Sequence, residues 1–366
     1  MQSVIQLKKS KNFMRINFIL NSVNDAHSMK RVNDFKKQGY DVKIFGFLRD
    51  ATTSKIPNAI ILGCFSNKQS YKKRISTYYK GIKCAFKEEK RQDILWYYLG
   101  LDVALFALLL SQKRTYIYEE CDLVHMYIRS NLIKKILEKI DKVIIRLSKK
   151  TLITSEGFID FHYHKRRVPN NIVLVPNKLT NDILQYPIIN RQLNIGCIRF
   201  AFVGVLRAKS LLSIANNISK NFPQHTFSFY GFIAPTFSEK DLPQRANINY
   251  HGRYQSPNDL PSIYSKVDVL ICTYDISGDN VKYAEPNKLY EAIYFGCPIV
   301  VSDKTFLAQK VKRLNIGYSV NPLDEQKVIE LVKRIEYELP TLTRNLQSLK
   351  KQEAIGNLSY INELLK

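Results

Sequence analysis

Short apolar runs of β-strand character alternate with longer helical patterns along almost all of this 366-residue chain. Such alternation is typical of βαβ units, in which helices join parallel strands and cover the sheet. In the first half we expect strands at 14–20, 41–47, 59–63, 115–120, 151–155 and 171–177. In the second half we expect strands at 198–204, 225–231, 248–252, 268–274 and 298–302. The sequence therefore predicts an α/β protein with doubly wound parallel sheets.

A polar stretch at 178–195 separates the two series of strands. We expect an N-terminal domain over 1–180 and a second domain over 181–342. Residues 343–366 read as a final helix that can pack back on the first domain. Among the other expected helices are 28–39, 131–150, 209–222 and 256–267.

The formal net charge of +24 predicts attraction to something anionic. Nine Lys or Arg lie in 68–91, interleaved with Tyr71, Tyr78, Tyr79 and Phe86, and eight more lie in 129–150. These charges can be solvated helix faces, a surface that meets an anionic membrane, or a groove for nucleic acid. We favour the first two and expect no nucleic acid.

The helical pattern at 131–150 carries an apolar stripe. Its members are Ile133, Ile136, Leu137, Ile140, Val143, Ile144 and Leu147. A stripe of this spacing is more often part of a core than a membrane contact.

The six cysteines are scattered singly, without a CxxC motif or a Cys/His cluster, which indicates a reduced, cytoplasmic protein without a structural metal. The start of the chain reads as an extension before the first strand rather than as a signal peptide. The longest apolar run, 99–110, is too short to span a bilayer. We expect a cytoplasmic protein, peripheral at the inner face of the cell membrane.

Two strand ends in the second half carry basic residues on glycine-containing loops. After the strand at 198–204, Gly204 is followed by Arg207 and Lys209 near a helix start, where free amides and the helix dipole favour an anion. Gly252 allows close backbone approach, and Arg253 follows it. Each loop can equally be an ordinary turn with surface charges.

A third strand end leads into a helix that begins near Pro286. Lys288 lies in its first turn and Glu291 one turn on, on the same side. The helix end and Lys288 could hold an anion while Glu291 accepts hydrogen bonds from a vicinal diol. The alternative is an intrahelical ion pair on a solvated face.

Three segments of the second half, FVGVLRAKSLL (202–212), YHGRYQSPNDLPSIYSKVDVLI (250–271) and AEPNKLYEAIYFGCPIVVSD (284–303), resemble the nucleotide-sugar-binding domain of family 4-like glycosyltransferases. Segments 16–47, 116–127, 148–158 and 172–177 look like the acceptor domain of that family. The resemblance implies the GT-B fold, with two Rossmann-like domains facing a cleft.

The resemblance implies that Arg207 and Lys209 bind the donor diphosphate, that Glu291 binds the ribose, and that His251 to Arg253 face the base. We take Arg207, Lys209 and Glu291 as catalytic. The expected donor-binding set is Gly204, Arg207, Lys209, His251, Gly252, Arg253, Glu285, Pro286, Asn287, Lys288, Leu289 and Glu291. Members of the family commonly have two glutamates eight positions apart, and the first contacts the donor sugar. Eight positions before Glu291 this chain has Tyr283, and Glu285 is only six positions before it. A contact between Glu285 and the sugar is therefore an open question.

On the acceptor side the chain lacks the family's glycine pair after the first strand. The polar residues there, and at the strand end near 120, are the expected acceptor contacts: His27, Ser28, Arg31, Glu120, Asp122 and His125. A lone histidine is more often structural. No D-x-D triplet occurs, so we expect no metal and no cofactor, with fixed cations stabilising the leaving group.

The resemblance implies a retaining glycosyltransferase of the hexosyltransferase type, and the absence of a D-x-D triplet predicts that it is metal-independent. The resemblance implies a UDP- or GDP-sugar donor and a glycan or polyprenyl-pyrophosphate-linked acceptor, as in capsular or exopolysaccharide biosynthesis. The alternatives are a nucleotide-sugar epimerase of the same architecture and a protein that is not an enzyme, either a basic scaffold or a nucleic-acid-binding module.

Overall fold

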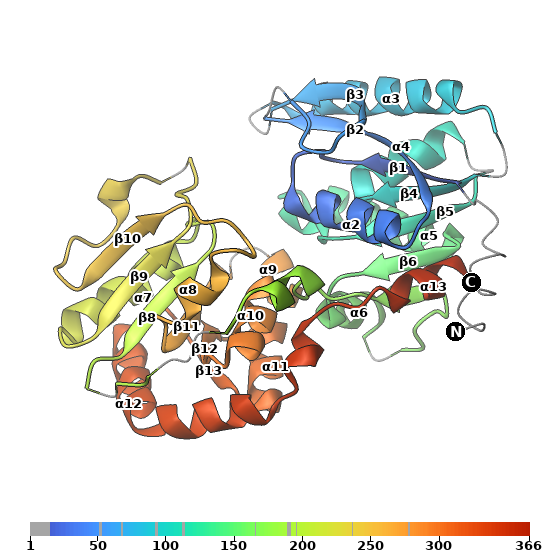
Figure 1. Cartoon of the computed structure of the whole chain (residues 1–366). Coiled ribbons are helices and arrows are strands. Elements are labelled where there is room, and N and C mark those ends of the chain that lie inside the picture. The colour runs from blue at the N-terminus through green and yellow to red at the C-terminus, as the bar shows by residue number, and fades with distance from the viewer. Residues whose placement is uncertain are drawn as a thin grey trace, which may run out of the picture. The chain divides into compact units, whose positions relative to one another are not determined.

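The computed structural model describes residues 15–50, 53–66, 69–91, 94–111, 114–164, 166–188, 192–194, 196–235, 237–276 and 279–366. Some features named from the sequence lie outside these residues: the expected leading extension, Met14 of the first strand, Lys68 of the basic segment and part of the stretch at 178–195. The side chain of Tyr71 is also outside the described part. The chain divides into two compact units (Figure 1). Unit 1 extends to Thr154 and includes His162–Val175 and Leu358–Lys366, and unit 2 comprises Ser155–Phe161 and Pro176–Asn357.

Unit 1 is a seven-stranded sheet in which every neighbouring pair is parallel. Its order is β3-β2-β1-β4-β5-β6-β7. The strands are β1 (Arg15–Leu20), β2 (Asp41–Arg49), β3 (Ile60–Phe65), β4 (Leu95–Leu99), β5 (Tyr116–Glu120), β6 (Lys150–Ile153) and β7 (Ile172–Leu174).

Helices cover both faces of this sheet. The helices α3 (Tyr71–Glu88), α4 (Leu101–Leu110) and α5 (Asn131–Leu147) share one core cluster with the strands. The helices α2 (Ala26–Lys37) and α13 (Ser359–Leu365) pack into the cluster on the other face. The 3₁₀ turn η1 (Val124–Tyr127) precedes α5, and α6 (Glu156–Tyr163) follows β6.

Unit 2 repeats the plan with six parallel strands in the order β10-β9-β8-β11-β12-β13. The strands are β8 (Arg199–Val203), β9 (Thr226–Tyr230), β10 (Ile248–Gly252), β11 (Val269–Cys272), β12 (Ile299–Ser302) and β13 (Gly317–Val320). The helices α7 (Lys209–Asn221) and α12 (Glu325–Ser348) cover one face. The helices α8 (Leu260–Tyr264), α10 (Asn287–Phe295) and α11 (Phe306–Leu314) cover the other, and α9 (Asp279–Tyr283) precedes α10.

The predicted doubly wound parallel sheets are therefore confirmed, with three local differences. Two strands were missed, β4 and β13. The first runs directly into the apolar helix α4 and could not be separated from it by periodicity. Helix α8 spans only five residues of 256–267, and 343–366 is not one helix but the end of α12, a 3₁₀ turn η4 (Lys351–Ala354) and α13.

The apolar stripe of α5 is only partly core, which corrects the expectation from its spacing. Ile144 is fully buried, but Ile133, Ile136, Val143 and Leu147 are exposed. The apolar side chains of α5 therefore cover more of the helix surface than the part that packs against neighbouring elements. Among the described residues, no helix is both long and apolar enough to cross a bilayer.

Close backbone packing at the carboxyl ends of β8 and β9 requires glycine. Gly231 has φ +134°, and a Cβ atom there would lie 1.7 Å from the carbonyl oxygen of Gly204. Its amide donates to the carbonyl of Gly252 at 2.7 Å. Three successive strand ends are thus held together at the edge of the sheet where ligands of such folds bind.

We predict that Gly231→Ala destabilises the protein by about 3 kcal/mol or more, because backbone must move to admit the methyl group. Gly39→Ala is the matched control, since Gly39 has φ +80° but no atom within 4 Å of a built Cβ. It should cost only about 1–2 kcal/mol of left-handed strain. Urea unfolding of both variants measures the difference, and equal losses would contradict the close approach.

Candidate functional site

The residues expected to bind a donor gather in unit 2 at the carboxyl ends of its strands. The strand order reverses between β8 and β11, which is where doubly wound sheets bind ligands. Gly204 follows β8, and a Cβ there would lie 3.6 Å from Cε of Lys288. The loop after β8 and the first turn of α10 are therefore neighbours, and the structure brings together two of the three segments singled out in the sequence.

Helix α10 carries a buried ion pair in its first turns. Nζ of Lys288 lies 2.7 and 2.9 Å from the two carboxylate oxygens of Glu291, and both residues are less than 10% exposed. The Tyr264 hydroxyl donates to Glu291 at 2.6 Å, and the Tyr254 hydroxyl lies 3.4 Å from Lys288 Nζ. The intrahelical pair exists, but the alternative of a solvated face is wrong because the pair is buried.

The carboxylate of Glu291 stabilises the charged form of Lys288. Burial alone would lower the pKa of Lys288, but the carboxylate of Glu291 offsets this and raises the pKa above its ordinary value. The helix begins after Pro286, which has no side-chain group to accept hydrogen bonds from the first-turn amides. The start of α10 therefore combines a lysine ammonium, paired with Glu291, with an uncapped helix N-terminus, an arrangement that suits an anion.

The start of α7 differs from our expectation. The backbone amides of Lys209 and Ser210 donate to the two carboxylate oxygens of Asp275 at 3.1 and 2.8 Å. These amides are therefore not free for an anion, because a carboxylate from the loop after β11 already occupies them. The side chains of Arg207 and Lys209 are exposed and remain available to a ligand.

The loop after β10 provides flat surfaces. The imidazole of His251 stacks on Tyr230 with ring centroids 4.3 Å apart and an angle of 7°. The guanidinium of Arg253 lies 4.7 Å above the ring of Phe232. Gly252 between them has φ +72°, a conformation that favours glycine.

Glu285 is buried and its carboxylate is already engaged. It accepts hydrogen bonds from the Tyr290 hydroxyl at 2.7 Å, Lys310 Nζ at 2.8 Å and the backbone amide of Glu156 at 3.0 Å. Lys310 also pairs with Glu156 at 2.8 Å. These contacts fix the start of α6 within unit 2.

Three other members of the expected donor set differ in burial: Leu289 is core, Pro286 is half-buried and Asn287 is exposed.

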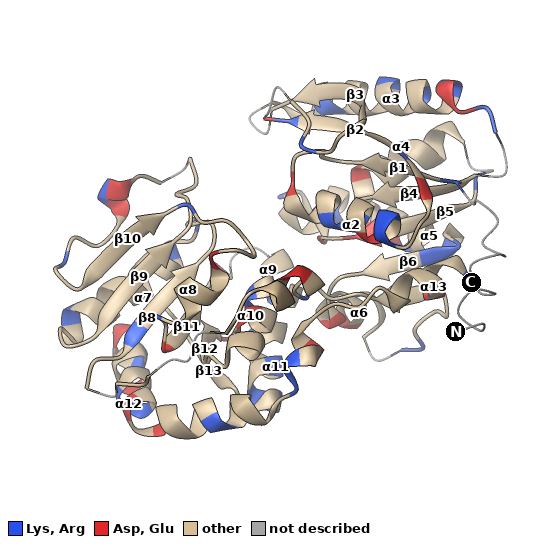
Figure 2. Cartoon of the chain, viewed as in Figure 1, with Lys and Arg blue, Asp and Glu red and all other residues tan. Residues whose placement is uncertain are grey.

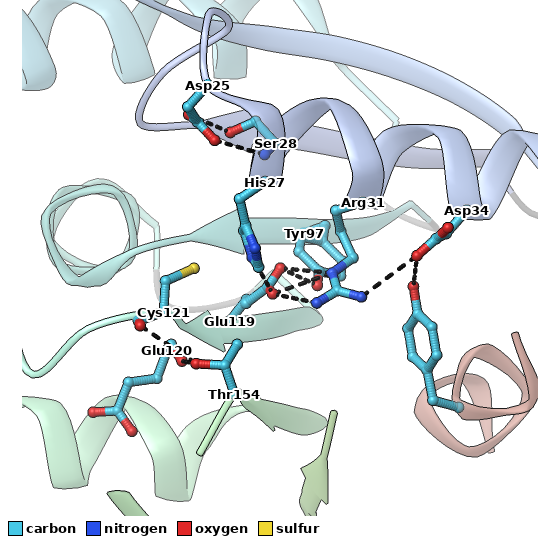
Figure 3. A network of polar contacts seen from close by, with 11 residues as sticks. Asp25, His27, Ser28, Arg31, Asp34, Tyr97, Glu119, Glu120, Cys121 and Thr154 are labelled. Atoms are coloured by element: carbon cyan, nitrogen blue, oxygen red, sulfur yellow. Dashed lines mark hydrogen bonds and ion pairs between the residues drawn. The ribbon is translucent and has the colours of Figure 1, made fainter. Parts of the chain in front are cut away.

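A polar network in unit 1 centres on Glu119, which the sequence analysis did not single out. Figure 3 shows His27, Arg31 and Tyr97 converging on its carboxylate. Arg31 donates from Nη2 at 2.6 Å and from Nε at 3.0 Å, the Tyr97 hydroxyl donates at 2.6 Å, and Nε2 of His27 lies 2.8 Å from Oε1. Burial alone would raise the pKa of Glu119, but Arg31 and His27 hold it below its ordinary value.

Most of the expected acceptor contacts are buried with partners inside unit 1. Ser28 bonds to Asp25, Arg31 to Glu119 and Glu120 to His162, and His125 is fully buried. Of the six expected contacts, only His27, which is partly exposed, and Asp122, which is exposed, are accessible at the surface. The signal missed at 119 was the pair of adjacent glutamates in an apolar strand, each of which needs a buried partner.

A second cluster lies on the other side of β5, because successive strand residues point to opposite faces. One ligand atom from each of Glu120, Asp141 and His162 lies within 4.8 Å of the other two. Figure 3 shows the Glu120 side chain pointing away from Glu119. Asp141 and His162 come from distant segments, so the sequence offered no spacing that could reveal the group.

Comparison with known proteins identifies the fold. No protein-family model and no curated protein matches the chain. Sucrose-phosphate synthase of Thermosynechococcus elongatus matches with TM-score 0.68 at 14% identity, covering 96% of this chain and 98% of that chain. Anabaena HepE in complex with UDP-glucose matches with TM-score 0.64 at 15%, covering 96% and 97%. The lipopolysaccharide outer core galactosyltransferase WaaB matches with TM-score 0.64 at 16%, covering 96% and 99%. The predicted GT-B fold is confirmed.

We predict that Arg31→Met destabilises the protein by about 3–5 kcal/mol, because it leaves the Glu119 carboxylate buried without its guanidinium. Arg15→Met is the control, since Arg15 forms an exposed pair with Asp41 at 2.7 Å, and such pairs contribute about 0–1 kcal/mol. Adding Glu119→Gln to Arg31→Met should recover part of the loss. Urea unfolding tests this, and a loss no larger than that of Arg15→Met would refute the role of the pair.

Proposed function

We propose that this protein is a glycosyltransferase that moves a sugar from a nucleotide-diphosphate donor to a glycan or lipid-linked glycan. The observation that carries the proposal is the buried Lys288–Glu291 pair at the start of α10, beside the strand end at Gly204. The fold supports it, since HepE, which shares it, was solved with UDP-glucose.

In this proposal Glu291 binds the ribose hydroxyls of the donor. A carboxylate has about four acceptor positions, and Lys288 and Tyr264 use three of them without ligand. Lys288 can turn toward a phosphate and release positions on Glu291 for a vicinal diol. Donor binding then replaces one charge-assisted contact by several.

The diphosphate lies against the start of α10 and the side chains of Arg207, Lys209 and Lys288. The stacked His251 and Tyr230, with Arg253, offer a flat surface to a uracil or guanine base. We do not assign the Glu285 carboxylate to the sugar, because Tyr290, Lys310 and the amide of Glu156 already bind it.

The reaction proposed is a retaining transfer in which the leaving diphosphate collects negative charge. Fixed cations aimed at developing charge lower the barrier more than they tighten donor binding. No metal is needed in this scheme to bridge the phosphates, because Arg207, Lys209 and Lys288 supply the positive charge. On the acceptor side, His27 and Asp122 are the groups that contact the glycan, with His27 oriented by Glu119.

We propose further that the outer surface of α3, α4 and α5 meets an anionic membrane, where a lipid-linked acceptor for capsule or exopolysaccharide assembly would be found. These helices share one core cluster and so form one layer of unit 1. Apolar side chains stand out from it, including Leu132 at 70% exposed and Leu147 at 54%. Exposed Lys135, Lys139 and Lys142 flank them on α5, and Figure 2 shows further basic residues along α3.

A thermal-shift screen of UDP, GDP, ADP and CMP tests the donor assignment. We expect one nucleoside diphosphate to raise the melting temperature, with a stabilisation of about 2.7 kcal/mol at a hundred times its Kd. Glu291→Gln should weaken this binding by about 2–4 kcal/mol through lost hydrogen bonds to the ribose. Glu330→Gln, an exposed residue of α12, is the control. Equal nucleotide affinity of both variants would reject the ribose contact.

Steady-state release of the nucleotide tests the diphosphate clamp. We expect turnover to persist in EDTA. Arg207→Lys should lower kcat by roughly 10²–10³ with a smaller change in donor KM, because a planar guanidinium binds two phosphate oxygens at once and an ammonium does not. Arg207→Ala should be worse and Lys209→Ala comparable or milder. Arg245→Lys, an exposed arginine of unit 2, should be silent. A wild-type kcat in Arg207→Lys, or activity that needs Mn²⁺, would refute this scheme.

Flotation with liposomes tests the membrane contact. Wild-type protein should float with anionic vesicles and not with neutral ones, and salt should weaken binding, because each basic residue near such a surface contributes about 1 kcal/mol. The double variant Leu132→Asn, Ile136→Asn should bind less. Leu323→Asn, which removes a 66% exposed leucine from unit 2, should not. Binding to both vesicle types alike would exclude this surface.

A further inference from the structure

The cluster beside the Glu119 network has the composition of a metal site. Glu120 stands at the end of β5, Asp141 in α5 and His162 in α6, and all three are at most 5% exposed. Nε2 of His162 lies 2.9 and 3.1 Å from the two carboxylate oxygens of Glu120. Two carboxylates and an imidazole thus converge on one point in the interior of unit 1.

The two carboxyl groups lack the compensation that Glu119 receives. Among the described residues, their ion-pair partners are the imidazoles of His162 and His125, and no lysine or arginine is among them. Oδ2 of Asp141 is buried and accepts no hydrogen bond from any described donor. Two carboxylates brought together away from water must be neutralised, either by protons or by a cation.

We propose that Glu120, Asp141 and His162 bind one divalent transition-metal ion of the Zn²⁺ class. Two oxygens and one imidazole nitrogen form a donor set that Zn²⁺ prefers, whereas Ca²⁺ takes six to eight oxygens and Mg²⁺ keeps several waters. The charge also balances, since two carboxylates neutralise a divalent ion when the imidazole is neutral. Nδ1 of His125 lies 3.7 Å from Oδ2 of Asp141 and is a further nitrogen atom close to the cluster.

The surroundings fit a metal centre as well. The Tyr118 hydroxyl donates to Oδ1 of Asp141 at 2.9 Å, which orients the carboxylate as outer hydrogen bonds do at metal sites.

The ion would act on the structure of unit 1 by tying β5 and α5 to the segment of unit 1 that begins at His162. Its ligands are separate from Arg207, Lys209, Lys288 and Glu291, which belong to unit 2. The inference therefore does not depend on the proposed glycosyl transfer, and activity that resists EDTA leaves it untouched.

Metal titration of the purified full chain, stripped with a chelator and dialysed, tests the proposal. Zn²⁺ is added in competition with a chromophoric chelator, and we expect about one tightly bound equivalent per chain. Asp141→Asn keeps the side-chain shape and His162→Gln replaces the imidazole by a polar amide, and each should weaken that binding by roughly tenfold or more. Glu138→Gln removes a partly exposed carboxylate one turn away on α5 and should leave the affinity unchanged.

Binding of Co²⁺ separates this site from the six cysteines. The wild-type spectrum should lack the strong near-ultraviolet band of thiolate ligation, and Zn²⁺ but not Mg²⁺ should raise the melting temperature. Equal Zn²⁺ affinity of wild-type and Asp141→Asn protein would overturn the proposal. Failure of the wild-type chain to bind one equivalent of Zn²⁺ would also overturn it. This measurement does not require that the variants fold. The three side chains would then be a part of the core in which the carboxyl groups share protons.

Discussion

The buried carboxylate of Glu119 is the constraint around which unit 1 is arranged. Its bidentate contact with Arg31 joins β5 to α2, and the Tyr97 hydroxyl joins the same carboxylate to β4, the neighbouring strand. An isolated charge at this depth would cost far more than folding can supply, so the arginine must accompany it. His27 reaches the same carboxylate and is thereby fixed in orientation at the strand ends.

The two units solve the problem of buried charge in the same way at different places. In unit 2 the carboxylate is Glu291, its cation is Lys288 on the same helix, and Tyr264 completes the set as Tyr97 does in unit 1. The difference is geometric. An arginine fork holds its carboxylate in a fixed plane, whereas a lysine at the end of a flexible chain can move to another anion. Unit 1 therefore has a rigid junction and unit 2 an exchangeable one.

The alternation of strands and helices predicted most elements of this fold, because period and length identify a segment without knowledge of its partners. It failed at β4, where strand and helix form one apolar run, and on α5, where amphipathic spacing cannot say what covers the stripe. The predicted positions of Lys288 and Glu291 rested on a spacing of three residues. The pairing of Arg31 with Glu119 and the capping of α7 by Asp275 join residues far apart in sequence, and only folding brings them together.

The return of the chain to unit 1 after unit 2 affects how the protein folds during synthesis. Tyr360, Ile361 and Leu364 belong to the same core cluster as β1 and α2, and the Tyr360 hydroxyl donates to Asp34 at 2.9 Å. A ribosome finishes the sheet of unit 1 long before it reaches these residues. Through that interval one face of the nascent sheet is covered by α2 but lacks α13, while unit 2 has its full sequence by residue 357. The unit that is begun first is thus the one completed last.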